Sequence, residues 1–140
     1  MDKPATHEVA AILYKDDRVL ACTRADATAS GAWGFPAGEV EPGEDPLRAC
    51  RRVVADQLGC GLSTIWLLTS LDYDDAESLR HIDCFVSALA PKSEPAPKEL
   101  GQVRWVSRDE LLDVTWLSAH AELARLIGME WDQVFMDMHL

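Results

Sequence analysis

The sequence lacks a long apolar run, and no stretch approaches the roughly 18–20 consecutive apolar residues of a membrane-spanning helix. It also lacks, near its N-terminus, the charged segment followed by an apolar one that marks a secretory signal. We therefore expect a protein that does not act in a membrane and that works in the cytoplasm.

Basic residues are scarce. The chain has 13 Lys and Arg against 24 Asp and Glu, which gives a formal net charge of −11. Nothing in the sequence supplies a basic stripe, so the composition argues against a nucleic-acid backbone as partner. A phosphorylated small molecule is compatible with this charge only where cations or a few placed arginines neutralise its phosphates.

The sequence also lacks paired cysteines, since no two of the four have the C-x-x-C spacing. Cys22, Cys50, Cys60 and Cys84 lie far apart in the chain. We expect buried, reduced thiols of a cytosolic protein, with disulfides as the alternative. The sequence also shows no internal repeat, no low-complexity segment and no Ser-His-Asp or Cys-His arrangement that would indicate a covalent nucleophile.

What the sequence does contain is enough apolar material for one core. At 140 residues and 48% apolar content, the chain has the size and composition of one ordinary domain. We expect a single domain over residues 1–140, with its core at about 8–127 and a C-terminal tail at 128–140. The tail carries Trp131 and Phe135. It suits packing on the domain or on a partner subunit, so a homodimer is kept as an alternative.

Short apolar segments separated by polar turns predict strands. Residues 8–14 and 18–23 flank a polar turn and predict a hairpin. Residues 62–71 and 79–88 flank an acidic turn at 72–78 and predict an antiparallel pair. Further expectations are a loop at 25–32, a surface loop at 91–97, a strand at 103–106, a short helix opened by a capping box at 107–110 and ending at 112, and a last helix at 119–127.

The longest predicted helix follows residue 45. Asp45 suits an N-cap, Pro46 is tolerated at the first helical position, and Gly59 is a usual helix end. Apolar residues recur on one face of this helix, at Leu47, Cys50, Val54 and Leu58. With strands before and after it and a helix at the end, the chain is predicted to be an α+β domain with a mixed sheet between helices.

The loop that leads into this helix is rich in carboxylates. Glu39, Glu41 and Glu44 lie close together in it, and its glycines allow backbone carbonyls to approach an ion. Magnesium prefers oxygen ligands and is often held by one or two carboxylates together with substrate phosphates. The loop is therefore a candidate magnesium site, although an acidic surface loop before a helix would show the same pattern.

The spacing within this loop and helix resembles a known signature. The Nudix hydrolase family has G-x5-E-x7-R-E-U-x-E-E-x-G-U, where U is a bulky apolar residue. Here the matching positions are Gly38, Glu44, Arg52, Val54, Asp56 and Gly59. The preceding Trp33-Gly34-Phe35-Pro36-Ala37-Gly38 is similar to the W-x-F-P-G-G of MutT-like members, and residues 99–106 and 109–111 resemble later family segments. The resemblance covers roughly residues 8–127.

This resemblance implies a Nudix-type α/β/α sandwich and a magnesium-dependent (or manganese-dependent) hydrolase. Water would attack phosphorus in a nucleoside di- or triphosphate, or in a nucleoside diphosphate linked to another moiety. The implied catalytic residues are Asp56 and Glu99, and Arg24, Trp33 and His120 are implied to contact substrate. The implied metal site comprises Gly38, Glu39, Glu41, Asp56 and Glu99, and the positions expected to maintain the structure are Gly38, Glu44, Arg52 and Gly59.

The signature is incomplete on the helix. The family has three glutamates at i, i+3 and i+4, on one helix face, where this chain has Val53, Asp56 and Gln57. One carboxylate therefore remains of three, and each is worth several kcal/mol beside a divalent ion. We expect weak metal binding and slow turnover. The alternative is a catalytically silent Nudix domain that binds a nucleotide or a protein partner.

Several of these residues also have a plain structural interpretation. Glu44 could pair with Arg52 to fix the loop to the helix, and Asp56 could pair with the same arginine. His120 could be a solvated residue near a helix start. Trp33 and Trp105 could be packed in the core, and His81 could be structural or exposed at a sheet edge.

Overall fold

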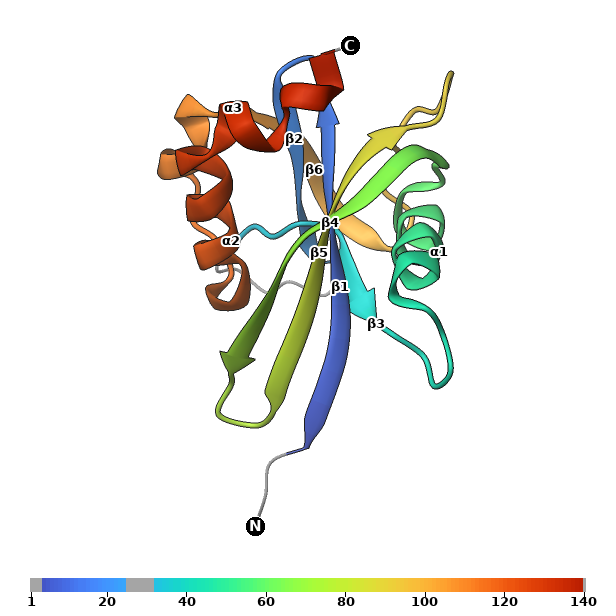
Figure 1. Cartoon of the computed structure of the whole chain (residues 1–140), viewed down its shortest axis with the longest axis vertical. Coiled ribbons are helices and arrows are strands. Elements are labelled where there is room, and N and C mark those ends of the chain that lie inside the picture. Colours follow the sequence, from blue (N-terminus) through green and yellow to red (C-terminus); the bar gives the residue numbers. More distant parts are fainter. Residues whose placement is uncertain (1–3, 25–31, 140) are drawn as a thin grey trace.

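A computed structural model describes residues 4–24 and 32–139. Its strands are β1 (Ala5–Lys15), β2 (Arg18–Arg24), β3 (Ala37–Glu39), β4 (Leu62–Asp74), β5 (Leu79–Leu89) and β6 (Leu100–Ser107). Its helices are α1 (Pro46–Leu58), α2 (Ser118–Met129) and α3 (Trp131–Val134), with 3-10 helices η1 (Asp109–Asp113) and η2 (Met136–His139) (Figure 1). Within the described residues, no helix combines the length and the apolar character needed to span a bilayer.

One mixed sheet, in the order β4-β5-β1-β2-β6, forms the centre of the fold. β1 pairs in parallel with β5 over most of its length, from Ala5 opposite Leu79 to Tyr14 opposite Ala88. The other edge of β1 is divided, because β3 pairs with its first half and β2 with its last residues. The sheet opens between these two partners, which leaves space at one end of the molecule.

The predicted hairpin is confirmed, and its turn has the expected chemistry. Asp16 and Asp17 both have positive φ, 51° and 63°. This combination is typical of the tight two-residue hairpin turn, and aspartate tolerates it better than most residues. The antiparallel pairing of β4 with β5 is also confirmed, with both strands longer than predicted.

Helices cover both faces of the sheet, so the chain has the predicted α/β/α arrangement (Figure 1). The side chains of β1 alternate between the two sides. Val9, Ala11 and Leu13 lie in the cluster that contains α1, while Ile12 and Tyr14 lie in the cluster that contains α2 and α3. Because both faces are covered, residues 9–14 of β1 are all buried.

α1 begins and ends as its sequence predicts. The Asp45 carboxylate accepts a 3.0 Å hydrogen bond from the Leu47 N–H, and Pro46 occupies the first turn. Gly59 ends the helix in the left-handed conformation, at φ 69°.

The four cysteines are buried, free thiols, and burial raises the pKa of Cys22, Cys50 and Cys84 to about 12.

The C-terminal tail packs on the domain itself. Phe135 is fully buried and stacks on Tyr14, with ring centroids 4.3 Å apart. The Trp131 indole N–H donates to a carboxylate oxygen of Asp17, at 3.0 Å, in the β1–β2 turn. Of the two positions considered for the tail, the structure shows packing on the same chain.

Four elements differ from their predicted ranges. β3 lies in a segment predicted as loop, because only three residues pair and they carry no strand pattern. The capping box forms, since Glu110 accepts from the Ser107 N–H at 3.1 Å and the Ser107 hydroxyl accepts from the Glu110 N–H at 3.4 Å. It opens a 3-10 helix that ends at Asp113. β6 and α2 each extend beyond the predicted ranges.

Candidate functional site

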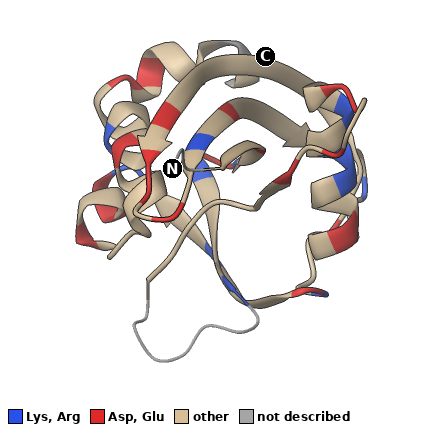
Figure 2. Cartoon of the chain, turned by 90° about the horizontal axis from the view of Figure 1, so that it is seen from below, with Lys and Arg blue, Asp and Glu red and all other residues tan. Residues whose placement is uncertain are grey.

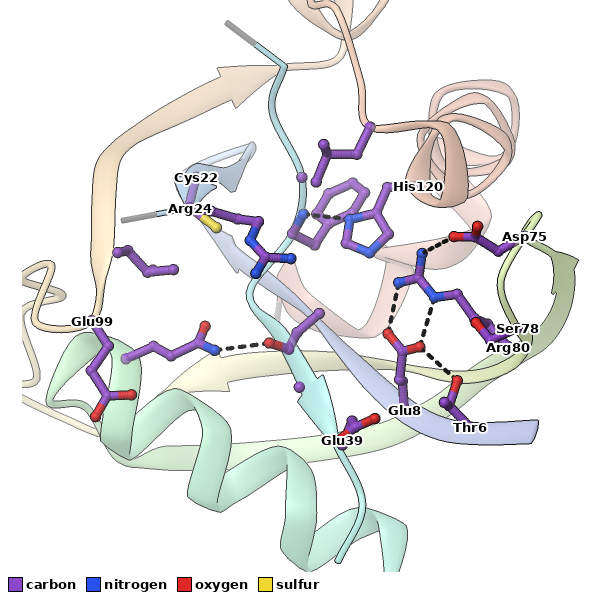
Figure 3. Close-up of a pocket in the computed structure, with 17 residues that line it drawn as sticks. Thr6, Glu8, Cys22, Arg24, Glu39, Asp75, Ser78, Arg80, Glu99 and His120 are labelled. Carbon is purple, nitrogen blue, oxygen red and sulfur yellow. Dashed lines mark hydrogen bonds and ion pairs between the residues drawn. The ribbon is translucent and has the colours of Figure 1, made fainter. Parts of the chain in front are cut away.

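A cavity of about 720 Å³ opens between β2 and β3, the two strands that share one edge of β1 (Figure 3). One wall comes from β3, α1 and the start of β6, and we call it the α1 wall. Its residues are Ala37, Gly38, Glu39, Gln57, Glu99 and Leu100. The other wall comes from β1, β5, α2 and the segment before β3, and we call it the His120 wall. Its residues include Thr6, Glu8, Phe35, Arg80, Leu117 and His120.

Beside the α1 wall, Glu44 anchors the loop to the helix. Its carboxylate accepts two hydrogen bonds from Arg52, at 2.8 and 2.9 Å, and a third from the Glu41 N–H at 3.0 Å. Arg52 also donates to the Glu39 carbonyl at 2.8 Å. The hydrogen bonds from Arg52, followed by that from the Glu41 backbone, lower the pKa of Glu44 to about 2. Glu44 thus has the structural interpretation expected from the sequence, and it does not line the cavity.

Asp56 and Glu41 lie outside the cavity lining. The Asp56 side chain is 53% exposed, and its carboxylate is 3.9 Å from the Arg52 guanidinium. Glu41 is 66% exposed and 4.0 Å from the same arginine. The helix therefore directs its one remaining carboxylate toward Arg52 and solvent.

Val53 faces inward, against β3. The side chain is 3% exposed. A Cβ built on Gly38 would lie 2.9 Å from a methyl carbon of Val53, closer than real Cβ contacts. Gly38 is therefore required for the close approach of α1 to β3, and an apolar side chain fills the position where the family has a carboxylate.

Gln57 carries its amide into the α1 wall and donates a 2.8 Å hydrogen bond to the Ala37 carbonyl. Its own side-chain oxygen is buried and has no hydrogen-bond partner in the described structure. The Ala37 carbonyl therefore already accepts a hydrogen bond, and this bond from the Gln57 side chain links α1 to β3.

These contacts test whether the residues fit the implied magnesium site. Gly38, Glu39 and Glu99 line the cavity, whereas Glu41 and Asp56 do not. In the part of the chain that the structure describes, the one group of three or more metal-ligating side chains with converging ligand atoms is His7, His81 and Asp83, outside this cavity. With Val53 and Gln57 on the helix, the donor set does not fit the expected magnesium cluster.

In the His120 wall, His120 is buried and neutral. It is 3% exposed, and its Nδ1 accepts a 3.0 Å hydrogen bond from the Phe35 N–H, which places the ring proton on Nε2. Burial, with a smaller contribution from the Arg80 charge, lowers the pKa of His120 to about 4. The imidazole fits where it does because Gly34 lacks a Cβ, which would lie 2.6 Å from Nδ1. His120 lines the cavity, and the alternative of a solvated histidine is wrong; its implied contact with substrate stays a prediction.

A bidentate ion pair forms the rest of this wall. Arg80 of β5 donates two hydrogen bonds of 2.7 Å to Glu8 of β1, and the Thr6 hydroxyl donates to the same carboxylate at 3.1 Å (Figure 3). Burial alone would raise the pKa of Glu8, but the hydrogen bonds and charge of Arg80 lower it below its usual value. This pair is not predictable from local sequence, because it depends on the register of the parallel strands.

Arg24 and Trp33 differ in position. Arg24, at the end of β2, lines the cavity and reaches into it (Figure 3). Trp33 is not in the lining. It packs against the core cluster that contains α2, and the Arg104 guanidinium lies 5.5 Å from the centre of its ring. Trp33 is therefore packed against the core, which is the structural alternative considered for it.

Most of the predicted loop at 25–32 lies outside the described residues.

Charges around this end of the molecule are mixed. Figure 2 shows Lys and Arg interspersed with Asp and Glu along the described chain, without a continuous basic stripe on the side in view. The cavity itself contains both signs, with Arg24 and Arg80 against Glu8, Glu39 and Glu99.

The fold and sequence were compared with known proteins. Residues 5–127 match the model of the NUDIX domain. Similar solved structures include the Escherichia coli ORF135 protein (23% identity, TM-score 0.78, 91% of each chain covered) and a MutT NUDIX hydrolase from Burkholderia pseudomallei (24%, 0.74, 87% of this chain and 96% of that one). Another is the NUDIX domain of Shewanella oneidensis NrtR complexed with ADP ribose (20%, 0.71, 88% and 86%). No curated protein sequence matches the chain.

At these identities the solved structures establish the shared fold, while the domain match covers most of the sequence and includes the whole cavity. The resemblance noted in the sequence over roughly residues 8–127 is thereby confirmed. The chain belongs to the NUDIX domain family.

Proposed function

We propose that this domain binds a nucleoside di- or triphosphate, or a nucleoside diphosphate linked to another moiety, in the cavity, and that binding exceeds hydrolysis as its activity. One observation carries this proposal. The Gln57 amide donates to the Ala37 carbonyl at 2.8 Å, in the wall where the family resemblance implies a cation. That wall keeps its shape through a hydrogen bond that needs no ion.

The cavity has the size and chemistry for such a ligand. Its volume of about 720 Å³ lies within the range of roughly 300–1,000 Å³ for small-molecule sites. Arg24 supplies a cation for phosphate, while Leu100 and Leu117 supply an apolar surface. The NrtR domain, complexed with ADP ribose, is a neighbour in fold whose ligand is a nucleoside diphosphate of this class.

Slow metal-dependent hydrolysis is the second candidate. Nudix hydrolases generally use divalent metal ions, and the carboxylates of Glu39 and Glu99 line the cavity. Two carboxylates together with substrate phosphates can hold one magnesium ion. This would leave a weakly bound Mg²⁺ or Mn²⁺ and a low rate. Residues 1–140 as a single domain, a cytoplasmic location and the homodimer stay predictions.

Calorimetry and thermal shift with ADP, ATP and ADP-ribose, each with magnesium and with EDTA, test the proposal. We expect at least one nucleotide to bind, with an affinity that EDTA changes by less than about threefold. Arg24→Ala should weaken binding about tenfold, since a hydrogen bond to a charged group contributes about 1.5–3 kcal/mol. The exposed helix arginine in Arg48→Ala is the matched control and should leave affinity unchanged.

Two results would contradict it. One is the absence of binding by every nucleotide in the panel. The other is binding that requires magnesium and is accompanied by phosphate or pyrophosphate release at the roughly 1–10³ s⁻¹ of an ordinary enzyme. The second result would establish the hydrolase in place of the binding domain.

A further inference from the structure

A second group of polar side chains lies outside the cavity, on the face of the sheet opposite the His120 wall. His7 of β1 alternates with Thr6 and Glu8, which line the cavity, and therefore points the other way. His81 and Asp83 of β5 likewise alternate with Ile82, which lies in the core cluster of α2 and α3. The three side chains are thus separate from the nucleotide site proposed above.

The pairing of the strands brings these side chains together. His7 is the register partner of His81 in the parallel β1–β5 pair, and Asp83 lies two residues farther along β5. On the other side of β5, β4 places Asp72 opposite His81 and Ser70 opposite Asp83. Five polar residues of three adjacent strands therefore share one small area of the sheet.

The ligand atoms of His7, His81 and Asp83 converge on one point. His7 Nε2 is 2.6 Å from Asp83 Oδ2, and His81 Nε2 is 3.1 Å from Asp83 Oδ1. The candidate ligand atoms of all three residues lie within 4.8 Å of one another. Ligand atoms of a tetrahedral zinc ion, with bonds of about 2.0–2.1 Å, lie roughly 3.3 Å apart. Small side-chain movements would therefore admit an ion.

The surrounding residues orient these three as they do in metal sites. Asp72 Oδ1 lies 2.7 Å from His81 Nδ1, which leaves Nε2 of that ring directed at Asp83. The Ser70 hydroxyl donates to Asp83 at 2.6 Å. A carboxylate behind a histidine and a hydrogen bond to the ligating carboxylate are typical of the second layer of a metal site.

Exposure suits a site with an open position. Asp83 is 12% exposed, whereas His7 and His81 are 41% and 46% exposed. The carboxylate lies at the bottom and the imidazoles line the rim, so a fourth ligand, such as water, can reach an ion from solvent. Two nitrogen ligands favour a transition metal such as zinc or cobalt over magnesium, which prefers oxygen.

We propose that His7, His81 and Asp83 form a site for a divalent transition metal, with Asp72 and Ser70 supporting it, outside the nucleotide cavity and on the sheet face opposite the His120 wall. The ion joins β1 to β5 at the end of the sheet that α1 does not reach (Figure 1). Its role is to hold these strands together. The proposal does not depend on nucleotide binding.

The contacts among these side chains can also be explained without a metal, and the experiment must distinguish the two explanations. Protonated histidines beside Asp83 and Asp72 would form a network of ion pairs with the same contacts. Full-length protein without an affinity tag, freed of metal with EDTA and dialysed, should therefore be titrated with Co²⁺ by visible absorption and with Zn²⁺ by calorimetry. We expect one equivalent to bind, with the visible bands of cobalt in a site of low coordination number.

Variants assign the ligands. His7→Gln and His81→Gln should each weaken binding at least tenfold, and Asp72→Asn about tenfold through the support of His81. Both histidines are exposed enough for these variants to fold. Glu77→Gln, an exposed acid in the β4–β5 turn, is the matched control and should bind as the parent does. A hundredfold excess of Zn²⁺ over its Kd should raise the Tm of the parent by about 5–10 °C.

Two outcomes overturn the proposal. The first is the absence of saturable Zn²⁺ or Co²⁺ binding by the parent protein at concentrations up to about 1 mM, where the affinity would be negligible. The second is unchanged binding by the His7→Gln/His81→Gln double variant, which would assign the ion to other carboxylates of this acidic chain.

Discussion

The two walls of the cavity differ in what holds them together. The His120 wall is held by two specific polar contacts: the buried, neutral imidazole on the Phe35 N–H and the partly buried bidentate pair of Arg80 with Glu8. The α1 wall has the shape of the family's helix and loop, but Val53 and Gln57 stand at two of the three positions that carry glutamates in the family signature. The His120 wall is thus fixed by specific polar contacts, whereas the α1 wall keeps the family's shape with different side chains.

The comparison shows that the shape of this site and its metal chemistry are separable. The Glu44–Arg52 pair, the Gly38–Val53 contact and the Gln57–Ala37 hydrogen bond fix α1 against β3 through protein atoms alone. The pocket can therefore persist while carboxylates are lost. Four experiments examine this difference between the walls.

The largest effect should come from restoring the α1 wall. In the double variant Val53→Glu/Gln57→Glu, two carboxylates return to the helix face beside Asp56. We expect nucleotide hydrolysis with magnesium to increase by about 10²–10⁴, the contribution typical of a general base. Phosphate or pyrophosphate release from the nucleotide that binds best measures it.

The same variant should be less stable than the parent without metal, because Val53 is buried and a carboxylate there has no partner. The control is Val53→Gln/Gln57→Glu, which adds similar bulk and one charge fewer. If the parent, the double variant and this control all hydrolyse nucleotide at equal, negligible rates, the His120 wall does not hold a substrate in a reactive position.

The second experiment uses pH to examine the His120 wall. The pKa of His120 is lowered to about 4 from an ordinary 6.5, so between these values the unfolded chain binds a proton that the folded one excludes. Stability is thus complete above about pH 6.5 and falls as pH drops toward 4, by about 3 kcal/mol in total. Urea unfolding should be measured for the parent and for His120→Gln across this pH range. The free energy of unfolding of the parent should fall with decreasing pH more steeply than that of the variant, by this amount. Parallel profiles would contradict a buried, neutral imidazole.

The third experiment breaks the ion pair of the His120 wall. Glu8→Gln should lower the free energy of unfolding by about 1–3 kcal/mol, less than a fully buried pair would, because the cavity admits water. Arg80→Gln should cost a similar amount, and the double variant should cost less than the sum, since the partners act as a unit. Strictly additive losses would show that the two side chains are not coupled. Glu77→Gln serves as the control for loss of one surface charge.

The smallest effect concerns packing in the α1 wall. Gly38→Ala brings a Cβ within 2.9 Å of the Val53 methyl and should destabilise the fold by about 1–2 kcal/mol through overpacking. Val53→Ala removes the obstacle, so the double variant Gly38→Ala/Val53→Ala should recover part of that loss relative to Val53→Ala alone. Chemical denaturation measures all three. If Gly38→Ala lowers the free energy of unfolding equally in the parent and in Val53→Ala, position 38 does not contact the Val53 side chain.

Local signals predicted the scaffold well. Both ends of α1 were predicted correctly because Asp45, Pro46 and Gly59 determine the conformation of residues close to them in sequence. The β1–β2 hairpin was predicted because its turn lies between two apolar runs. The mixed sheet and the family followed from the order of elements and from the spacing of Gly38 to Gly59. β3 was missed, since three residues become a strand only where the edge of β1 is available.

The site was predicted less completely, because its contacts depend on register. Glu8 meets Arg80, and His7 meets His81, only once β1 and β5 are aligned in parallel across 74 residues of sequence. No local pattern specifies that alignment. The sequence identified Gln57 as a departure from the signature, but its hydrogen bond to Ala37 depends on how closely Gly38 lets α1 approach.

The parallel pairing of β1 with β5 also has a consequence for how the chain reaches its fold during synthesis. β1 and β2 can pair early, but the other edge of β1 finds its neighbour only after residue 79 has been made. At about 5–20 residues per second, translation leaves that edge open for roughly 4–15 s. The outer edge of β2 stays open longer still, until β6 has been made. An apolar hairpin with free edges is a template for unwanted pairing with another chain, so the nascent protein is most vulnerable to aggregation before its fifth and sixth strands are made.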